Sequence, residues 1–200
     1  MEFPAAFEAR GLRMRPYQES DVPHLISALN DPQTVRFMSG TPGTVNIQTT
    51  TAWVHAQAVV SAQRPDRFGY AVADPATDEL LAGAVLHVTR RRAGAEIGFW
   101  VCPAVRGRGV ASTLTRALAD LCIAQGVHRL ELFIRPDNVL SQRVALAAGF
   151  RPEGELRDVL PGPGGTLRHN AILWSRLATD VVTVDSTGER KVLAQLAGSS

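Results

Sequence analysis

The sequence predicts an α/β fold, because segments with the period of a strand alternate with segments with the period of a helix. A chain of 200 residues with 45% apolar and 20% charged side chains suits a single core-forming domain. A strand, loop, helix and strand follow one another over residues 95–135 and predict a βαβ unit with a parallel strand pair. We expect one domain over residues 1–178 and an appendage or flexible tail over 179–200, where the pattern is lost.

The first third of the chain predicts a short strand and two helices. Residues 12–15 alternate as a strand, and Ser20 is the candidate N-cap of a helix that ends at Leu29, before an Asn-Asp-Pro sequence. Residues 33–47, rich in Gly and Pro, are expected to form a loop. The next helix is expected over residues 48–62. Its buried face would carry Trp53, Ala56 and Val60.

A hairpin and a strictly alternating strand follow. The predicted strands at 67–73 and 80–89 flank a turn rich in Asp, Pro and Thr. Residues 95–101 alternate, so that Glu96, Gly98 and Trp100 share one face of the sheet. The remaining elements are expected as a helix over 109–125, a strand over 129–135, a helix over 139–148, and closing strands near 150–158 and 167–177 around a Pro-Gly-rich turn at 161–165.

Charge and cysteine content exclude several classes of function. The 21 basic and 19 acidic side chains leave a net charge of +2, too weak to predict a nucleic-acid partner, and the arginines at 90–92 fit a solvated turn. Cys102 and Cys122 have neither zinc-site nor redox-motif spacing, and the histidines show no i, i+4 pair, so no metal is expected. With no membrane-length apolar stretch or signal sequence, we expect a cytoplasmic protein with no membrane partner.

The segment Arg106-Gly107-Arg108-Gly109-Val110-Ala111 carries the strongest chemical signal. It joins an alternating strand to an amphipathic helix, where backbone N–H groups and the positive end of the helix dipole converge on an anion. Its glycines let a ligand approach the backbone, and its arginines add charge. The segment lacks the Lys-Ser/Thr of a P-loop and the full GxGxxG fingerprint, and taken alone it also fits an exposed turn.

This loop resembles the R/Q-x-x-G-x-G/A signature of the GCN5-related N-acetyltransferases (GNAT), which grips the pyrophosphate of acetyl-CoA. Residues 95–101 resemble the family's central strand, residues 138–144 its late helix, and Ala148-Gly149-Phe150 the turn after it. The opening is similar to the RimJ/RimL branch, which acetylates ribosomal-protein N-termini and other amines. The residues that carry this second likeness are Leu12-Arg13-x-Arg15-Pro16, Asp21 and Asn30-Asp31-Pro32.

The resemblance implies a twisted, mostly antiparallel mixed sheet, flanked by helices, that splays open at its parallel strand pair. Pantetheine would lie in the gap and bond free backbone groups near Val101 and Cys102, as an added strand does. Acetyl-CoA is the implied co-substrate. The implied cofactor-binding residues are Val101, Cys102, Arg106, Gly107, Arg108, Gly109, Val110, Ala111, Asn138 and Arg143.

Two side chains are candidates for the chemistry. An amine must lose a proton before it can attack, and Glu96 is the candidate base, directly or through water, with a surface glutamate as the alternative. Ser141 is the candidate acid for the departing thiolate, with helix capping as the alternative. Asn138 fits a helix cap, a pantetheine contact or both, and a backbone N–H near Val101 would bind the oxyanion. Cys102 is expected to be a packed cysteine rather than a nucleophile.

The function that the resemblance implies is transfer of an acetyl group to a primary amine, on a protein or peptide N-terminus, by direct attack in a ternary complex. Three alternatives stay open: a small-molecule or antibiotic amine as acceptor, a succinyl donor, and a silent CoA-binding module. The acceptor site would be walled by residues 33–62 and 155–168, which carry Phe37, Trp53, Glu155 and Asp158. A homodimer is common in this branch.

Overall fold

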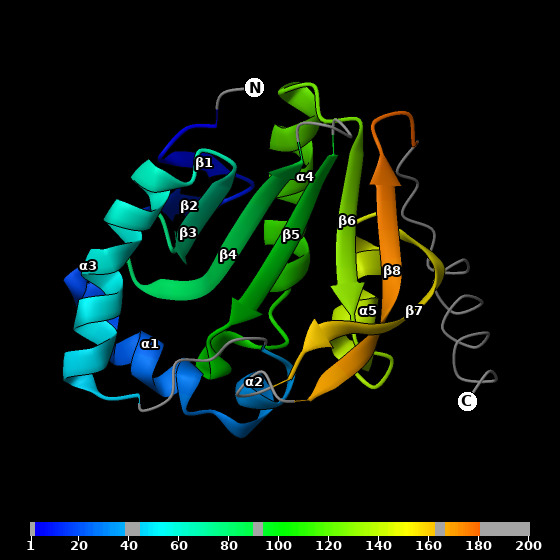
Figure 1. Ribbon diagram of the computed structural model, residues 1–200. Coiled ribbons are helices and arrows are strands. Elements are labelled where there is room, and N and C mark those ends of the chain that lie inside the picture. The colour runs from blue at the N-terminus through cyan, green and yellow to red at the C-terminus, as the bar shows by residue number, and fades with distance from the viewer. Residues whose placement is uncertain (1–2, 39–44, 90–93, 163–166, 181–200) are drawn as a thin grey trace.

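The computed structural model describes residues 3–38, 45–89, 94–162 and 167–180, except for the side chains of 58–62, and contains one mixed eight-stranded sheet (Figure 1). The strand order is β1-β2-β3-β4-β5-β6-β8-β7. The strands are β1 (Phe7–Ala9), β2 (Leu12–Arg15), β3 (Arg67–Ala73), β4 (Leu80–Thr89), β5 (Gly94–Val101), β6 (Arg129–Ile134), β7 (Arg151–Pro161) and β8 (Arg168–Leu177). The α-helices are α1 (Val22–Leu29), α2 (Pro32–Phe37), α3 (Ile47–Gln63), α4 (Val110–Ala124) and α5 (Val139–Ala147), with 3-10 turns η1 (Glu19–Asp21) and η3 (Pro103–Val105).

The sheet has one parallel pair, which confirms the βαβ prediction. Strands β5 and β6 pair only over Gly94–Glu96 and Arg129–Glu131, and every other neighbouring pair in the sheet is antiparallel. Beyond Glu96 and Glu131 the two strands diverge (Figure 1). The splayed, mostly antiparallel sheet that the family resemblance implies is therefore present.

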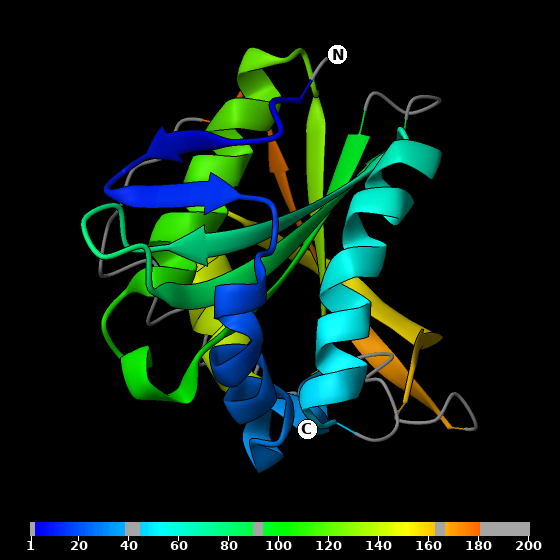
Figure 2. The ribbon, with the colours of Figure 1, turned by 90° about the vertical axis from the view of Figure 1, so that its left-hand side faces the viewer.

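Helices cover both faces of the sheet. Figure 2 shows α3 on one side of the strands and α4 on the opposite side. The face toward α4 holds the main core, where Leu114, Leu118 and Cys122 of the helix pack with Leu86 and Ile97 of the sheet. The strict alternation of β5 puts Ile97 in this core and leaves Glu96, Gly98 and Trp100 for the other face.

The structure corrects the expected loop at 33–47. Residues 32–37 form helix α2, because Asp31 caps it by accepting the Thr34 N–H at 2.8 Å and Pro32 has the backbone angle that a first helical turn requires. The loop prediction rested on the glycines and proline at 40–43, which follow α2 in sequence and say nothing about residues 32–37. Residues 39–44 lie outside the described part. Strand β1 was also not expected, since its three residues are too few to show a period.

Two further expectations about helices are wrong. Ser20 is not the N-cap of the first helix, which is preceded by η1, where the Gln18 N–H donates to the Asp21 carboxylate. On α3, Thr50 and Val54 are buried and Ala56 is exposed. Trp53 is partly buried and packs against the core as expected, so the inward face is shifted from the predicted one mainly at Ala56. The Val60 side chain lies outside the described part.

Candidate active site

A cavity of about 640 Å³ opens where β5 and β6 diverge. Glu96, in the last residue pair that joins the two strands, lines this cavity, and Gly98 and Trp100 line it further along the same sheet face. The cavity brings together most of the site residues that the sequence predicts, namely Glu96, Val101, Arg106, Gly107, Gly109, Val110, Ala111, Asn138 and Ser141. Cys102, Arg108 and Arg143 do not line it.

The loop before α4 has the geometry of an anion site. Gly107 and Gly109 both have positive φ, of 76° and 79°, which other residues adopt only with strain, and Gly109 is the N-cap of the helix. The first bond of the helix is donated by the Thr113 N–H to the Gly109 carbonyl at 3.0 Å. The three N–H groups before Thr113 have no partner within the helix, and together with the helix dipole they favour a phosphate at this point.

The free edge of β5 lies along the same cavity. The Cys102 N–H donates to the Leu81 carbonyl of β4 at 2.9 Å. Because backbone groups in an antiparallel pair alternate in direction, those of Phe99 and Val101 point into the gap, where no described strand pairs with them. The edge beside Val101 can therefore accept an extended amide chain.

The backbone of Cys102 is not free to bond pantetheine, in contrast to the expectation from the sequence. Its N–H is bonded to Leu81 and its carbonyl accepts from the Val105 N–H at 3.1 Å, so neither backbone group is free for a ligand. The thiol is buried and donates to the Leu80 carbonyl at 3.3 Å, and burial raises its pKa to about 11. A thiol held neutral is a poor nucleophile, which agrees with the expected packed cysteine.

The two arginines of the loop lie in different environments. The Arg106 guanidinium, predicted at the rim of a pyrophosphate site, bonds the Asp31 carboxylate at 2.5 Å and the Thr34 hydroxyl at 2.8 Å, both at the start of α2. Arg108 is exposed, and its side chain makes no hydrogen bond or ion pair with any residue that the structure describes. Arg143 is likewise exposed on α5.

Glu96 lies in an electrostatic environment suited to a base. The pKa of its carboxyl is raised above the ordinary value, first because cavity walls displace water from around it and second because Glu131 of β6 faces it. Arg67, on β3 of the same sheet face, lowers the pKa in part. The side chain is still reached by solvent, since the cavity is open, so an acceptor and the carboxylate can meet there.

Asn138 and Ser141 lie at the start of α5, across the gap from the loop before α4. The Asn138 side chain accepts the Ser141 N–H at 3.2 Å and so caps the helix, which confirms one of its two expected roles. The Ser141 side chain is partly exposed and lines the cavity. The capping oxygen therefore comes from Asn138, and the Ser141 hydroxyl is left for the cavity.

Gly83 of β4 allows the side chains of Tyr17 and Trp100 to pack against the strand backbone. A Cβ on Gly83 of β4 would lie 2.3 Å from the Tyr17 hydroxyl and 2.4 Å from the Trp100 indole nitrogen, so both rings lie directly on this backbone. The Tyr17 ring meets the Trp53 ring edge to face, with centroids 5.0 Å apart. Burial is the main reason that the pKa of Tyr17 is raised, so its hydroxyl stays neutral.

The acceptor wall is only partly as predicted. Phe37 and Trp53 line the cavity, whereas Glu155 and Asp158 do not, and β7 contributes Leu160 instead. The sequence analysis missed Tyr17, Arg67 and Arg135, which also line it. Arg67 had a detectable signal, because pairing the predicted hairpin in register places it on the sheet face of Glu96. The positions of Tyr17 and Arg135 depend on the path of the chain after β2 and after β6, which the sequence pattern does not predict.

The described part of the chain also bears on metal binding and membrane crossing. No group of three or more His, Cys, Asp or Glu side chains there is placed to hold a metal ion. None of the helices described is long and apolar enough to cross a membrane. The Arg90-Arg91-Arg92 segment lies outside the described residues.

A family model for the acetyltransferase (GNAT) domain matches residues 11–151. No curated protein matches the sequence. The match covers β2 to the start of β7, which includes the loop before α4, both diverging strands and the start of α5. The matched segment contains the residues that line the cavity, except for Leu160 of β7.

Solved structures share this fold at low sequence identity. Mycobacterium smegmatis RimJ, in complex with CoA-disulfide, is 22% identical with a TM-score of 0.73, over 92% of this chain and 89% of that one. Ribosomal-protein-S5-alanine acetyltransferase from Vibrio fischeri is 21% identical with a TM-score of 0.70, over 90% and 100%. Microcin C7 self immunity acetyltransferase MccE, in complex with acetyl-CoA and AMP, is 17% identical with a TM-score of 0.74, over 88% and 97%.

Proposed function

This chain belongs to the GNAT family of acetyltransferases, and from that premise we propose that it transfers the acetyl group of acetyl-CoA to the N-terminal amine of a protein or peptide. The observation that carries the proposal is the single cavity that joins a phosphate-binding helix N-terminus, a free strand edge and Glu96. The shared fold of RimJ and the S5-alanine acetyltransferase supports a peptide acceptor. The acetyl-CoA bound to MccE supports the donor.

The donor fits the residues present. Its diphosphate would accept from the backbone N–H groups of Val110, Ala111 and Ser112, and Arg108 is free to add its charge. The pantetheine amides would bond the free backbone groups of Val101 in the gap. The thioester would then lie in the cavity that Glu96 and Ser141 both line.

The transfer then needs one base and one acid. Glu96, directly or through a water molecule, takes a proton from the ammonium group, and the nitrogen lone pair attacks the thioester carbonyl carbon. A backbone N–H at the open edge near Val101 stabilises the oxyanion. As the C–S bond breaks, the nitrogen gives its second proton to solvent and becomes the amide nitrogen. The thiolate of CoA takes the proton of the Ser141 hydroxyl, which recovers one from solvent.

An acceptor panel tests the proposal. Release of CoA thiol is measured with acetyl-CoA and succinyl-CoA against N-terminal peptides, their N-terminally blocked forms, polyamines and aminoglycosides. We expect turnover with acetyl-CoA and unblocked peptides only. Turnover confined to polyamines or aminoglycosides would overturn the peptide assignment. Tight CoA binding with no turnover on any amine would identify a silent binding module.

Ser141→Ala is expected to lower kcat by about tenfold to a hundredfold while leaving the KM of acetyl-CoA close to that of the wild type. The reason is that the leaving thiolate loses its proton donor, whereas the cap of α5 comes from Asn138 and is retained. Steady-state kinetics measure both constants, and circular dichroism checks that the helix is intact. An unchanged kcat would exclude Ser141 as the acid.

A further inference from the structure

Helix α2 is a six-residue helix that bridges the two sides of the splayed sheet. Its start is bonded to Arg106, in the loop after β5, and its end to Asp137 and Arg135, in the segment after β6 (Figure 1). A helix this short is unstable on its own in water. Its position therefore depends on these two sets of contacts, which we call the Arg106 clamp and the Asp137 clamp.

The Arg106 clamp consists of hydrogen bonds that the charged Arg106 guanidinium donates to the start of α2. The Arg106 guanidinium donates to Asp31 at 2.5 Å, to Thr34 at 2.8 Å and to Gln33 at 3.0 Å. The Asp31 carboxylate also accepts the Thr34 N–H and hydroxyl, at 2.8 and 3.1 Å. The side chains of Arg106 and Asp31 are 28% and 19% exposed, which limits screening by solvent. Arg106 thus completes the cap of α2.

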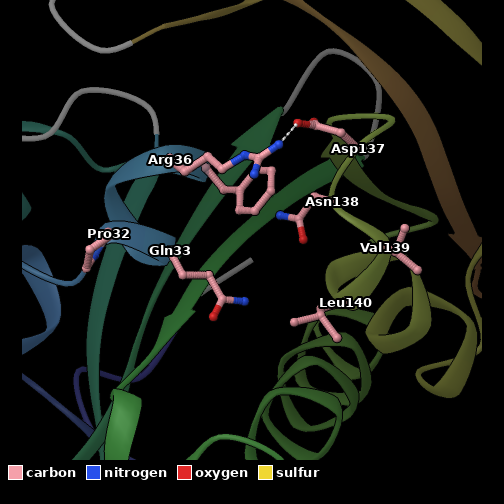
Figure 3. Close-up of a pocket in the computed structure, with 8 residues that line it drawn as sticks. Pro32, Gln33, Arg36, Asp137, Asn138, Val139 and Leu140 are labelled. Carbon is pink, nitrogen blue, oxygen red and sulfur yellow. Dashed lines mark hydrogen bonds and ion pairs between the residues drawn. The ribbon is translucent and has the colours of Figure 1, made fainter.

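The Asp137 clamp holds the other end. Arg36 donates to Asp137 at 2.9 Å, and Arg135 donates to the same carboxylate and to the Arg36 carbonyl, at 2.9 and 3.0 Å. Both guanidinium groups lie over the Phe37 ring, 5.1 and 5.3 Å from its centroid. Figure 3 shows Arg36 reaching across to Asp137 above a hollow of about 410 Å³ between α2 and the start of α5.

Helix α2 lies on the acceptor side of the cavity. The anion site belongs to α4, which covers one face of the sheet, whereas α3 covers the opposite face and contributes Trp53 to the cavity wall (Figure 2). Phe37 of α2 lines the cavity together with Trp53 and Leu29. Moving α2 therefore changes the wall that an amine would contact rather than the phosphate site.

We propose that Arg106 is a positioning residue for the amine acceptor, which holds α2 through Asp31, Gln33 and Thr34 instead of binding the donor's diphosphate. Both terminal nitrogens of its guanidinium are already bonded to residues of the Arg106 clamp, so a diphosphate would compete with Asp31, a largely buried carboxylate with no other cation bonded to it in the described part of the chain. Arg108, in the same loop, is exposed and unpaired among the described residues, and it is the arginine available to the diphosphate. The inference rests on the proposed function for the identity of donor and acceptor.

The experiment compares Arg106→Gln, Asp31→Asn, the double variant and the matched control Arg108→Gln. The KM of the amine acceptor is measured at saturating acetyl-CoA and again with S-acetylpantetheine, which lacks the diphosphate. The Kd of CoA is measured by calorimetry, and unfolding is followed in urea. The acceptor is the amine that the wild-type protein acetylates, whether or not it is a peptide.

We expect Arg106→Gln and Asp31→Asn each to raise the acceptor KM by about tenfold with either donor, and the double variant to be no worse than either single one. Their CoA Kd should stay within about twofold of the wild type, whereas Arg108→Gln should weaken CoA binding and spare the acceptor KM. Loss of CoA affinity in Arg106→Gln but not in Asp31→Asn, or a defect that disappears with S-acetylpantetheine, would overturn the proposal.

The test also separates this inference from the proposed function. Failure of the wild-type protein to acetylate peptides contradicts the proposed acceptor and leaves the comparison of variants intact with another amine. If no amine is acetylated, CoA Kd and unfolding still decide: equal, non-additive destabilisation in Arg106→Gln and Asp31→Asn with unchanged CoA Kd supports the clamp. Additive destabilisation or weakened CoA binding in Arg106→Gln contradicts it.

Discussion

Replacing Glu96 by glutamine is expected to lower kcat at neutral pH by about 10²- to 10⁴-fold, the usual contribution of a general base, without changing the Kd of CoA. The amide keeps the shape of the side chain that lines the cavity and removes its ability to take a proton. The measurements are steady-state release of CoA thiol and calorimetric binding of CoA. A variant with wild-type kcat would show that another group accepts the proton.

The pH profile adds a second readout of the same residue. A base is active when it is deprotonated, so kcat falls as the pH drops through the pKa of Glu96, and a raised pKa moves this fall to higher pH. Glu131 contributes to the raised value, and Arg67 opposes it. Glu131→Gln removes the facing negative charge and should therefore shift the acid limb to lower pH, with kcat on the plateau retained. If the acid limb of the pH profile does not move in Glu131→Gln, the group that titrates there is not Glu96.

The sequence predicts the elements of this fold well because most of them carry a clear period. The strands at 67–73 and 80–89 match β3 and β4, and the alternation of residues 95–101 places Glu96 on the correct face. Helix α2 was missed because it has six residues and is held by distant partners, Arg106 and Asp137, which no local pattern reveals. The period of apolar residues reveals helices and strands that bury an amphipathic face. It does not reveal a short helix that is held by side chains from distant parts of the chain.

The sequence predicts those parts of the candidate site that are formed by backbone groups. Gly107 and Gly109 are identified by sequence because positive φ restricts the residue type, and the helix start follows from its position. The sequence is a weaker guide to side-chain partners: it assigns the charge of Arg106 to a ligand, while the structure pairs it with Asp31. Likewise, Cys102 is next to the open edge in sequence, yet its backbone groups are already bonded.

Two of the residues that carry the likeness to the RimJ/RimL branch, Arg15 and Asp21, form a buried ion pair in the structure. The Arg15 guanidinium bonds both oxygens of the Asp21 carboxylate, at 2.8 and 2.9 Å, and the two side chains are 6% and 2% exposed. Asp21 also accepts the Gln18 N–H at 2.9 Å. The pair thereby joins the end of β2 to the start of α1 on either side of Tyr17, which lines the cavity.

Asp21→Asn is therefore expected to lower the free energy of unfolding by about 3–5 kcal/mol, because it leaves the Arg15 charge buried without its closest partner. The measurement is equilibrium unfolding in urea, with an unchanged m-value as evidence of a two-state comparison. Asp78→Asn is the matched control, since Asp78 bonds the same guanidinium at 3.0 Å but its side chain is 38% exposed, and a loss of about 1 kcal/mol or less is expected. Equal losses in the two variants would contradict the assignment.

Replacing both Arg15 and Asp21 by methionine and leucine should recover part of the stability lost in Asp21→Asn, since no buried charge is then left unpaired, although the Gln18 N–H loses its acceptor. If that double variant folds but has a raised acceptor KM, the pair is retained to hold Tyr17 against Gly83 and Trp100 rather than to stabilise the fold.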